Sequence, residues 1–228
     1  MLVKWGSIIV KGTGKLGGHV FSTGRSGASV HTRAKARNPQ TKYQMQIRSR
    51  FTQFTQGWRD LTDTQRESWY DAESSFSRTN RFGDVVTLSG KNLYESLNTQ
   101  RAVIVLPPLS IAPMPILLEP NVVTEVRFRL SEFKLFINGI FGDEKVYVIV
   151  GTKPLSQGTK FVQSNLRILG FGLSIPAGDN IGTYFDTYDM YVARFGVPTV
   201  GQNIFIGTYF INESGQRTPV SIQSAIYD

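Results

Sequence analysis

The stretch PPLSIAPMPILLEPNVVTEVRFRL, residues 107–130, decides the fold of this chain. Its first portion, residues 107–120, holds five of the ten prolines, a composition typical of a stiff, extended linker. In the remainder, alternate positions mark the same side of a half-buried strand, namely Val122, Thr124, Val126, Phe128 and Leu130. We therefore predict an α+β fold with a boundary at residues 107–120, a helical domain over residues 39–106 and a β domain over residues 121–228.

Three helices are predicted on the N-terminal side of this boundary. The first follows Pro39 and carries one continuous apolar stripe, Tyr43, Ile47, Phe51, Phe54 and Trp58. A capping box, Thr62 with Gln65, predicts the start of the second helix, whose inner face is expected to hold Trp69, Ala72 and Phe76. The third begins at Ser89. Trp58 and Trp69 are therefore expected in the core.

On the C-terminal side the hydrophobic pattern has the period of strands. Similar runs follow at Phe133–Asn138, Lys145–Val150, Asn203–Ile211 and Val220–Ile226. Hairpin loops are predicted at Gly142–Glu144 and Asn212–Gly215. The runs 166–169, 184–189 and 190–195 fit strands or loops. The pattern predicts an antiparallel β-sandwich of about seven strands.

Residues 1–38 are rich in glycine and basic side chains, and we expect a basic arm containing a β-hairpin. Strands are indicated at Ser7–Val10, His19–Thr23 and Ala28–Arg33, with a turn at Gly24–Gly27 between the last two. Such a segment cannot build a core by itself. It is therefore either flexible or folded against a partner.

The charge is concentrated in the same half of the chain. No acidic residue precedes Asp60, whereas eleven Lys and Arg do. Residues 1–106 carry 16 basic and 7 acidic side chains, and residues 107–228 carry 9 and 10. A one-sided positive field of this kind attracts a polyanion or an acidic protein surface.

The contact candidates come from the basic arm. Four of them are cations suited to phosphates or acidic side chains, Arg25, Arg33, Lys35 and Arg37. The others are a polar or cationic group and two aromatic anchors, namely His19, Trp5 and Phe21. The sequence does not choose between nucleic acid, an acidic protein surface and simple solvation of these charges.

Catalytic, cofactor and metal sites are not expected. The chain lacks cysteine. The motif G-x-G-x-x-G at Gly12–Gly17 is followed by a strand-like run instead of a helix, so turns explain it better than nucleotide binding. His19 and His31 have no carboxylates at catalytic spacing, and Asp186–Asp189 reads as a solvated loop. The apolar run at Ser7–Val10 is too short for a signal peptide or a membrane span, and we expect no membrane partner.

A large segment of the chain resembles a known family. The resemblance covers about residues 12–98 and rests on Gly14–Ser22, Asn38–Thr41, Arg48, Phe51, Trp58–Thr62, Gln65, Arg66, Trp69, Arg81–Asp84 and Gly90–Tyr94. These motifs are similar to an uncharacterised family encoded by phages and prophages, especially of Bacteroidetes-type hosts, which includes proteins of crAss-like phages. The β domain has only a general likeness to the immunoglobulin or fibronectin-like modules that end such proteins. The resemblance implies a virion component, not an enzyme, and gives no catalytic residues.

Together these observations predict a bacteriophage structural protein that assembles repetitively in the capsid, neck or tail. Its partners would be copies of itself, other virion proteins and, through residues 1–59, DNA. The expected location is the virion, assembled in the host cytoplasm. Two alternatives remain open. One is a non-virion nucleic-acid-binding protein, and the other is a host-adhesion module that uses loops 151–165 and 172–190 of the β domain.

Overall fold

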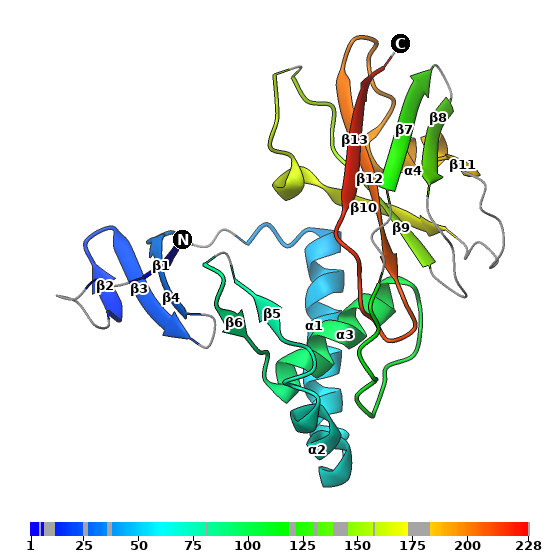
Figure 1. Cartoon of the computed structure of the whole chain (residues 1–228). Coiled ribbons are helices and arrows are strands. Elements are labelled where there is room, and N and C mark those ends of the chain that lie inside the picture. The colour runs from blue at the N-terminus through cyan, green and yellow to red at the C-terminus, as the bar shows by residue number, and fades with distance from the viewer. Residues whose placement is uncertain are drawn as a thin grey trace. The chain divides into compact units, whose positions relative to one another are not determined.

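The computed structural model describes residues 1–4, 6, 12–24, 27–35, 38–80, 82–118, 122–129, 132–138, 146–156, 158–172 and 183–227. The described residues form four α-helices, and all their named strand pairs are antiparallel, so the chain has a mixed α/β fold (Figure 1). It divides into two compact units. Unit 1 holds Met1–Ser96 with Leu109–Met114, and unit 2 holds Leu97–Pro108 with Pro115–Asp228. The proline-rich segment predicted as a linker at residues 107–120 is thus shared between them.

The first element of unit 1 is a small sheet in the order β1-β4-β3-β2. Its strands are β1 (Leu2–Val3), β2 (Gly14–Leu16), β3 (His19–Gly24) and β4 (Gly27–Thr32). The predicted hairpin is confirmed, because β3 and β4 pair from His19 with Thr32 down to Gly24 with Gly27. In the described part of residues 1–32 the chain thus forms a sheet, and an extended arm is not shown. The predicted strand at 7–10 lies outside the described residues.

The three predicted helices of residues 39–106 are present. They are α1 (Lys42–Asp60), α2 (Asp63–Asp71) and α3 (Gly90–Val103). The capping box of α2 is confirmed, since Thr62 Oγ1 accepts from the Gln65 N–H and Gln65 Oε1 accepts from the Thr62 N–H. At the third helix, Ser89 accepts from the Leu93 N–H through its carbonyl and from the Asn92 N–H through its hydroxyl.

Helix α1 follows Pro39, as predicted. Thr41 is its N-cap, because its hydroxyl accepts from the Gln44 N–H at 3.3 Å and satisfies a donor that the helix leaves unpaired. One detail of the helix prediction was wrong. Phe76 does not continue the face of α2, which ends at Asp71. A short antiparallel pair, β5 (Arg78–Thr79) and β6 (Val85–Val86), follows α2 in the chain.

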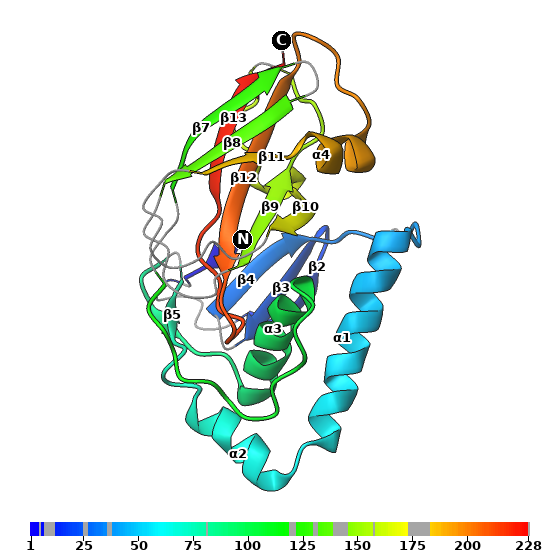
Figure 2. The same ribbon diagram turned by 90° about the vertical axis from the view of Figure 1, so that its right-hand side faces the viewer.

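Unit 2 contains two antiparallel sheets. One has the order β10-β9-β12-β13, with β9 (Val146–Gly151), β10 (Arg167–Gly172), β12 (Asn203–Ile211) and β13 (Ser221–Ile226). The other has the order β11-β8-β7, with β7 (Val122–Arg129), β8 (Glu132–Asn138) and β11 (Thr183–Asp186). In both views β7 lies next to β13 (Figures 1 and 2). The five runs predicted as strands beyond residue 120 are confirmed. The hairpin loop predicted at Gly142–Glu144 lies outside the described residues.

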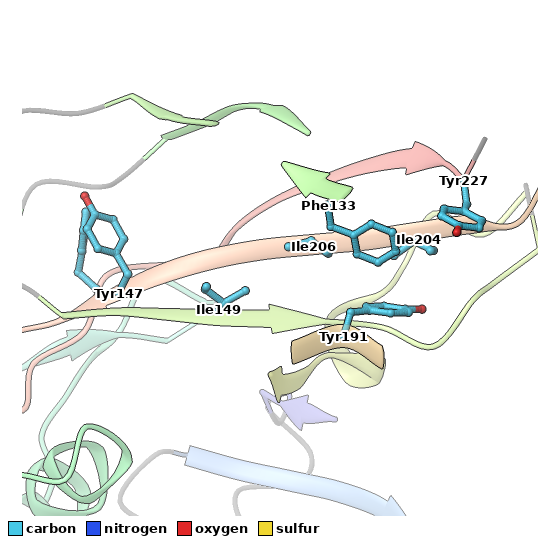
Figure 3. Close-up of a cluster of buried hydrophobic side chains, with 8 residues drawn as sticks. Phe133, Tyr147, Ile149, Tyr191, Ile204, Ile206 and Tyr227 are labelled. Carbon is cyan, nitrogen blue, oxygen red and sulfur yellow. The ribbon is translucent and has the colours of Figure 1, made fainter. Parts of the chain in front are cut away.

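The main core of unit 2 joins both sheets and one helix. Its buried members are Phe133 of β8, residues of β9 and β12, Tyr227 and a tyrosine of helix α4 (Tyr188–Phe195). Figure 3 shows this cluster and labels Phe133, Tyr147, Ile149, Tyr191, Ile204, Ile206 and Tyr227. The centroid of the Phe133 ring lies 4.9 Å from that of the Tyr191 ring and 5.7 Å from that of the Tyr227 ring, and both pairs are edge to face. Such pairs add about 0.5–1.5 kcal/mol each beyond the area they bury.

Residues 184–186 belong to strand β11, in agreement with the prediction of strand or loop, whereas residues 188–195 form helix α4. The helix corrects the strand or loop predicted for those residues and the solvated loop predicted for Asp186–Asp189. The carboxylate of Asp186 accepts hydrogen bonds from the N–H groups of Phe133, at 3.1 Å, and Tyr188, at 2.9 Å. It therefore fastens the end of β11 and the start of α4 to β8. A second cluster of unit 2 holds Ile104, Val148, Val150, Tyr209 and Ile211.

Candidate functional site

The N-terminal sheet has two chemically different faces. Paired residues of an antiparallel sheet lie on the same face, and neighbours along a strand lie on opposite faces. The registers of β1, β2, β3 and β4 therefore put mostly apolar residues on one face, namely Val3, Leu16, Phe21, Ala28 and Val30, together with His19, Thr23 and Thr32. We call this set the apolar sheet face. The other face carries Leu2, Lys15, Val20, Ser22, Ser29 and His31, and the Ser22 and Ser29 hydroxyls are 2.7 Å apart.

Neither face is fully buried within the described part of the chain. All described residues of the four strands are half-buried or exposed, and Leu16 exposes 72% of its surface. A soluble protein normally stabilises a small sheet by covering at least one of its faces. The sheet therefore retains exposed apolar surface, most clearly at Leu16.

The structure brings together some of the predicted contact residues. His19 and Phe21 lie two positions apart on β3 and share the apolar sheet face. Arg33 and Lys35 follow β4 and are exposed, and the Arg33 N–H donates to the Gly18 carbonyl at 2.7 Å. His31 occupies the opposite face from His19, so the two histidines do not form one site. The candidates Trp5, Arg25 and Arg37 lie outside the described residues.

One basic residue of this region is used inside unit 1. The Lys4 ammonium is 3.0 Å from the Asp84 carboxylate and 5.3 Å from the centre of the Phe82 ring. The hydrogen bond from Lys4, and a second from Asn80, lower the pKa of Asp84 below its ordinary value. Lys4 is thus committed to an internal contact that nothing in the sequence indicated.

Helix α1 adds a second surface with exposed apolar side chains, which was not predicted from the sequence. The predicted apolar stripe is continuous, but only its second half is buried. Phe54 and Trp58 expose 5% and 8% of their surface, whereas Ile47 and Phe51 expose 38% and 53%. Arg48 and Arg50 lie beside the exposed half. Periodicity marks such a stripe, but it does not tell how much of it the rest of the chain covers.

Helix α2 carries charge of the opposite sign. Asp63, Glu67 and Asp71 recur every four residues and are exposed, as is Asp60 at the end of α1. These four are among the seven acidic residues of residues 1–106. Tyr70 exposes 52% of its surface among them. The i, i+4 spacing was visible in the sequence and could have predicted this acidic face.

The G-x-G-x-x-G motif does not lead into a helix. Gly14 and Leu16 of the G-x-G-x-x-G motif belong to strand β2, and Gly17, with φ of +54°, lies in the turn to β3. A phosphate loop would instead lead into a helix. Within the described part of the chain, no three acidic or histidine side chains gather as a metal site requires. Among the same residues, no helix combines the length and the hydropathy needed to cross a membrane.

Comparisons with known proteins add little to this picture. No protein-family model matches the chain, and no curated protein does. Among solved structures, the chain is similar to a family 76 glycoside hydrolase from a bovine Bacteroides thetaiotaomicron strain, at 13% identity and a TM-score of 0.29. That match covers 48% of this chain and 20% of the hydrolase. A likeness of this size carries no argument about fold or activity.

Proposed function

We propose that this protein is a bacteriophage virion structural protein that assembles repetitively in the capsid, neck or tail. The observation that carries the proposal is the incomplete burial of the N-terminal sheet, whose described residues include none that is fully buried. The likeness of residues 12–98 to phage and prophage proteins supports the same conclusion. In this proposal the protein acts in the virion and is not an enzyme.

The energetics of the N-terminal sheet favour a partner. Fixing the backbone of one residue costs about 1–2 kcal/mol of conformational entropy. Burying apolar surface normally offsets this cost, at about 25 cal/mol per Å². Val3, Phe21, Ala28 and Val30 of the apolar sheet face are half-buried and Leu16 is exposed, so part of that gain is still to be made. A neighbouring subunit that covers Phe21, Val30 and Leu16 would supply it.

We further propose that residues 1–38 act as a basic arm that reaches a neighbouring subunit or DNA. Arg33 and Lys35 are exposed and follow the sheet directly. Before Asp60 there is no acidic side chain to neutralise them. A positive arm suits a position near the path of the DNA, and we therefore favour a ring or connector over a decoration protein.

The finer architecture of unit 2 belongs to the same proposal. Its two antiparallel sheets contribute to one buried cluster, in which Phe133 of one sheet accompanies Ile149 and Ile204 of the other. We propose that they are the layers of an immunoglobulin or fibronectin-like β-sandwich. Its outer surface would face partners or lie laterally in the particle.

Light scattering on the nuclease-treated protein, at about 0.1 M and about 0.5 M salt, tests the proposal. The expected result is an assembly of several copies that persists at the higher salt and is lost in a variant lacking residues 1–38. The variant matched to this deletion replaces Arg33 and Lys35 by Gln, because it removes two positive charges and keeps the residues of the sheet. A wild-type protein that is monomeric at both salts would contradict assembly as an intrinsic property.

Nucleic-acid binding outside a virion is the second candidate, favoured by the absence of acids before Asp60 and the exposure of Arg33 and Lys35. Binding to duplex DNA of random sequence discriminates it. If six or more phosphates are contacted, the affinity falls about 10³-fold or more between about 50 and 200 mM salt. A monomer with such affinity favours this candidate over the virion proposal.

A further inference from the structure

The exposed half of helix α1 is an unpartnered helix face of mixed character. Ile47 and Phe51 form its apolar centre, and Arg48 and Arg50 flank them on either side, as the helical spacing of 100° per residue requires. We call these four residues the α1 face. Within the described part of the chain, neither arginine makes an ion pair. An aromatic anchor between two arginines is the composition found at the centres of protein interfaces.

The outer side of helix α2 has the complementary composition. Glu67 and Asp71 lie one turn apart, and Tyr70 and Asp63 fall on the same side of the helix. We call these four residues the α2 face. Asp63 is paired with Arg66 at 2.8 Å, whereas the described residues give Glu67 and Asp71 no ion pair. The Tyr70 ring packs edge-on against Trp58, with centroids 5.9 Å apart, so the ring is held in place before any partner arrives.

We propose that the α1 face of one copy docks on the α2 face of the next, in a head-to-tail contact between copies of this chain. This inference deepens the proposed repetitive assembly and rests on it. Charge complementarity favours the α2 face, and not a second α1 face, as the surface that binds the α1 face. The residues before Asp60 contain no acid, so two α1 faces placed together would bring arginines against arginines. The α2 face offers carboxylates around a half-exposed tyrosine, which would pair with Arg48 and Arg50 while Tyr70 meets Phe51.

One copy can use both faces at the same time. Phe51 precedes Asp60 by nine residues of continuous helix, which is about 14 Å along the axis of α1. Helix α2 begins beyond that end, at Asp63. A contact between two different patches of the same molecule does not end with a pair. It repeats from copy to copy and gives a ring if the rotation closes, or a filament if it does not.

A charge-swap experiment tests the contact. The first variant combines Arg48→Glu with Arg50→Glu, the second combines Glu67→Arg with Asp71→Arg, and the third carries all four changes. The mass of each nuclease-treated protein is measured by light scattering at about 0.1 M salt. We expect the first two variants to lose the assembly of the wild type and the third to regain it, since opposite charges face each other again. Arg48, Glu67 and Asp71 are exposed, and circular dichroism verifies that each variant is folded.

Lys153→Glu with Lys160→Glu is the control matched to the first variant, because it reverses two exposed cations of unit 2 and changes the net charge by the same amount. It is expected to assemble as the wild type does. If the wild type assembles and the first two variants do so equally well, the α1–α2 contact is overturned while repetitive assembly stands. If the wild type is itself monomeric, the proposed assembly function fails first. Assembly lost in the control as well would point to net charge alone and would also overturn the contact.

Discussion

The indole Nε1 of Trp69 donates a hydrogen bond of 3.0 Å to the carbonyl oxygen of Ser110. Both residues belong to unit 1, although 41 positions of sequence separate them. A second bond lies beside the first, because the Ala112 N–H donates to the Ser68 hydroxyl at 3.2 Å. The beginning of the proline-rich segment is therefore fastened to helix α2 by two hydrogen bonds.

This relationship predicts the cost of changing Trp69, which is completely buried and packs edge to face with Tyr94 at 5.3 Å. Trp69→Phe keeps an aromatic ring but removes the donor to Ser110, and we expect a loss of about 1–3 kcal/mol in the free energy of unfolding. Trp69→Ala also leaves a cavity in the core and should lower the free energy of unfolding by about 3–5 kcal/mol. Urea unfolding measures both. Tyr70→Phe, at a half-exposed position, should stay within about 0.5 kcal/mol of the wild type.

The capping box of α2 gives a second prediction. Thr62→Ala removes the acceptor for the Gln65 N–H, and we expect a loss of about 1 kcal/mol in the free energy of unfolding. The matched control is Thr64→Ala, at an exposed position in the first turn of the same helix. Alanine has the better helix propensity there, so stability should be unchanged or slightly raised. Equal effects at both positions would contradict the assigned cap.

A third prediction concerns Gly215 in the loop between β12 and β13. Its φ is +78°, a region that side chains disfavour, and an added Cβ would collide with the Leu97 carbonyl oxygen of helix α3. Gly215→Ala should therefore destabilise unit 2 by more than about 1 kcal/mol. Gly158→Ala is the control, because its Cβ would meet no atom within 4 Å. Thermal unfolding compares the two, and an unchanged midpoint for Gly215→Ala would refute the close approach.

Sequence patterns predicted the elements that are long and regular. Helix α1 followed from its stripe, and strand β12 has the predicted limits of Asn203 and Ile211. The hairpin of β3 and β4 followed from the turn at Gly24–Gly27. These features depend on local spacing and turn chemistry, which neighbouring residues determine.

The rest depends on contacts between distant residues. Helix α4 has only eight residues, several of them aromatic or β-branched, so its pattern suited a strand equally well. It is fixed by Asp186, whose partner Phe133 lies 53 positions away. The exposure of Phe51 was equally hidden, because periodicity shows which side of a helix is apolar but not whether another element covers it. Strands β1 and β2 are too short to carry any pattern.

The last prediction concerns the pH dependence of the contact between Lys4 and Asp84. The hydrogen bonds from Lys4 and Asn80 lower the pKa of Asp84 below its ordinary value of 3.8. A group with a lowered pKa in the folded state stabilises that state above its unfolded pKa and loses this contribution as the pH falls through the folded pKa. The attachment of the first strand should therefore be intact at neutral pH and weaken only below pH about 4.

Hydrogen exchange of the Val30 amide measures this effect, because that amide donates to the Met1 carbonyl at 2.8 Å and so reports on strand β1. Its protection, corrected for the intrinsic exchange rate at each pH, should decrease on acidification in the wild type. In Asp84→Asn the ion pair is missing at every pH, so the protection should already be lower at neutral pH and change little on acidification. Asp71→Asn, which leaves the Lys4 contact in place, should behave as the wild type does. Equal profiles for wild type and Asp84→Asn would show that the pairing of β1 with β4 holds the first strand without help from Asp84.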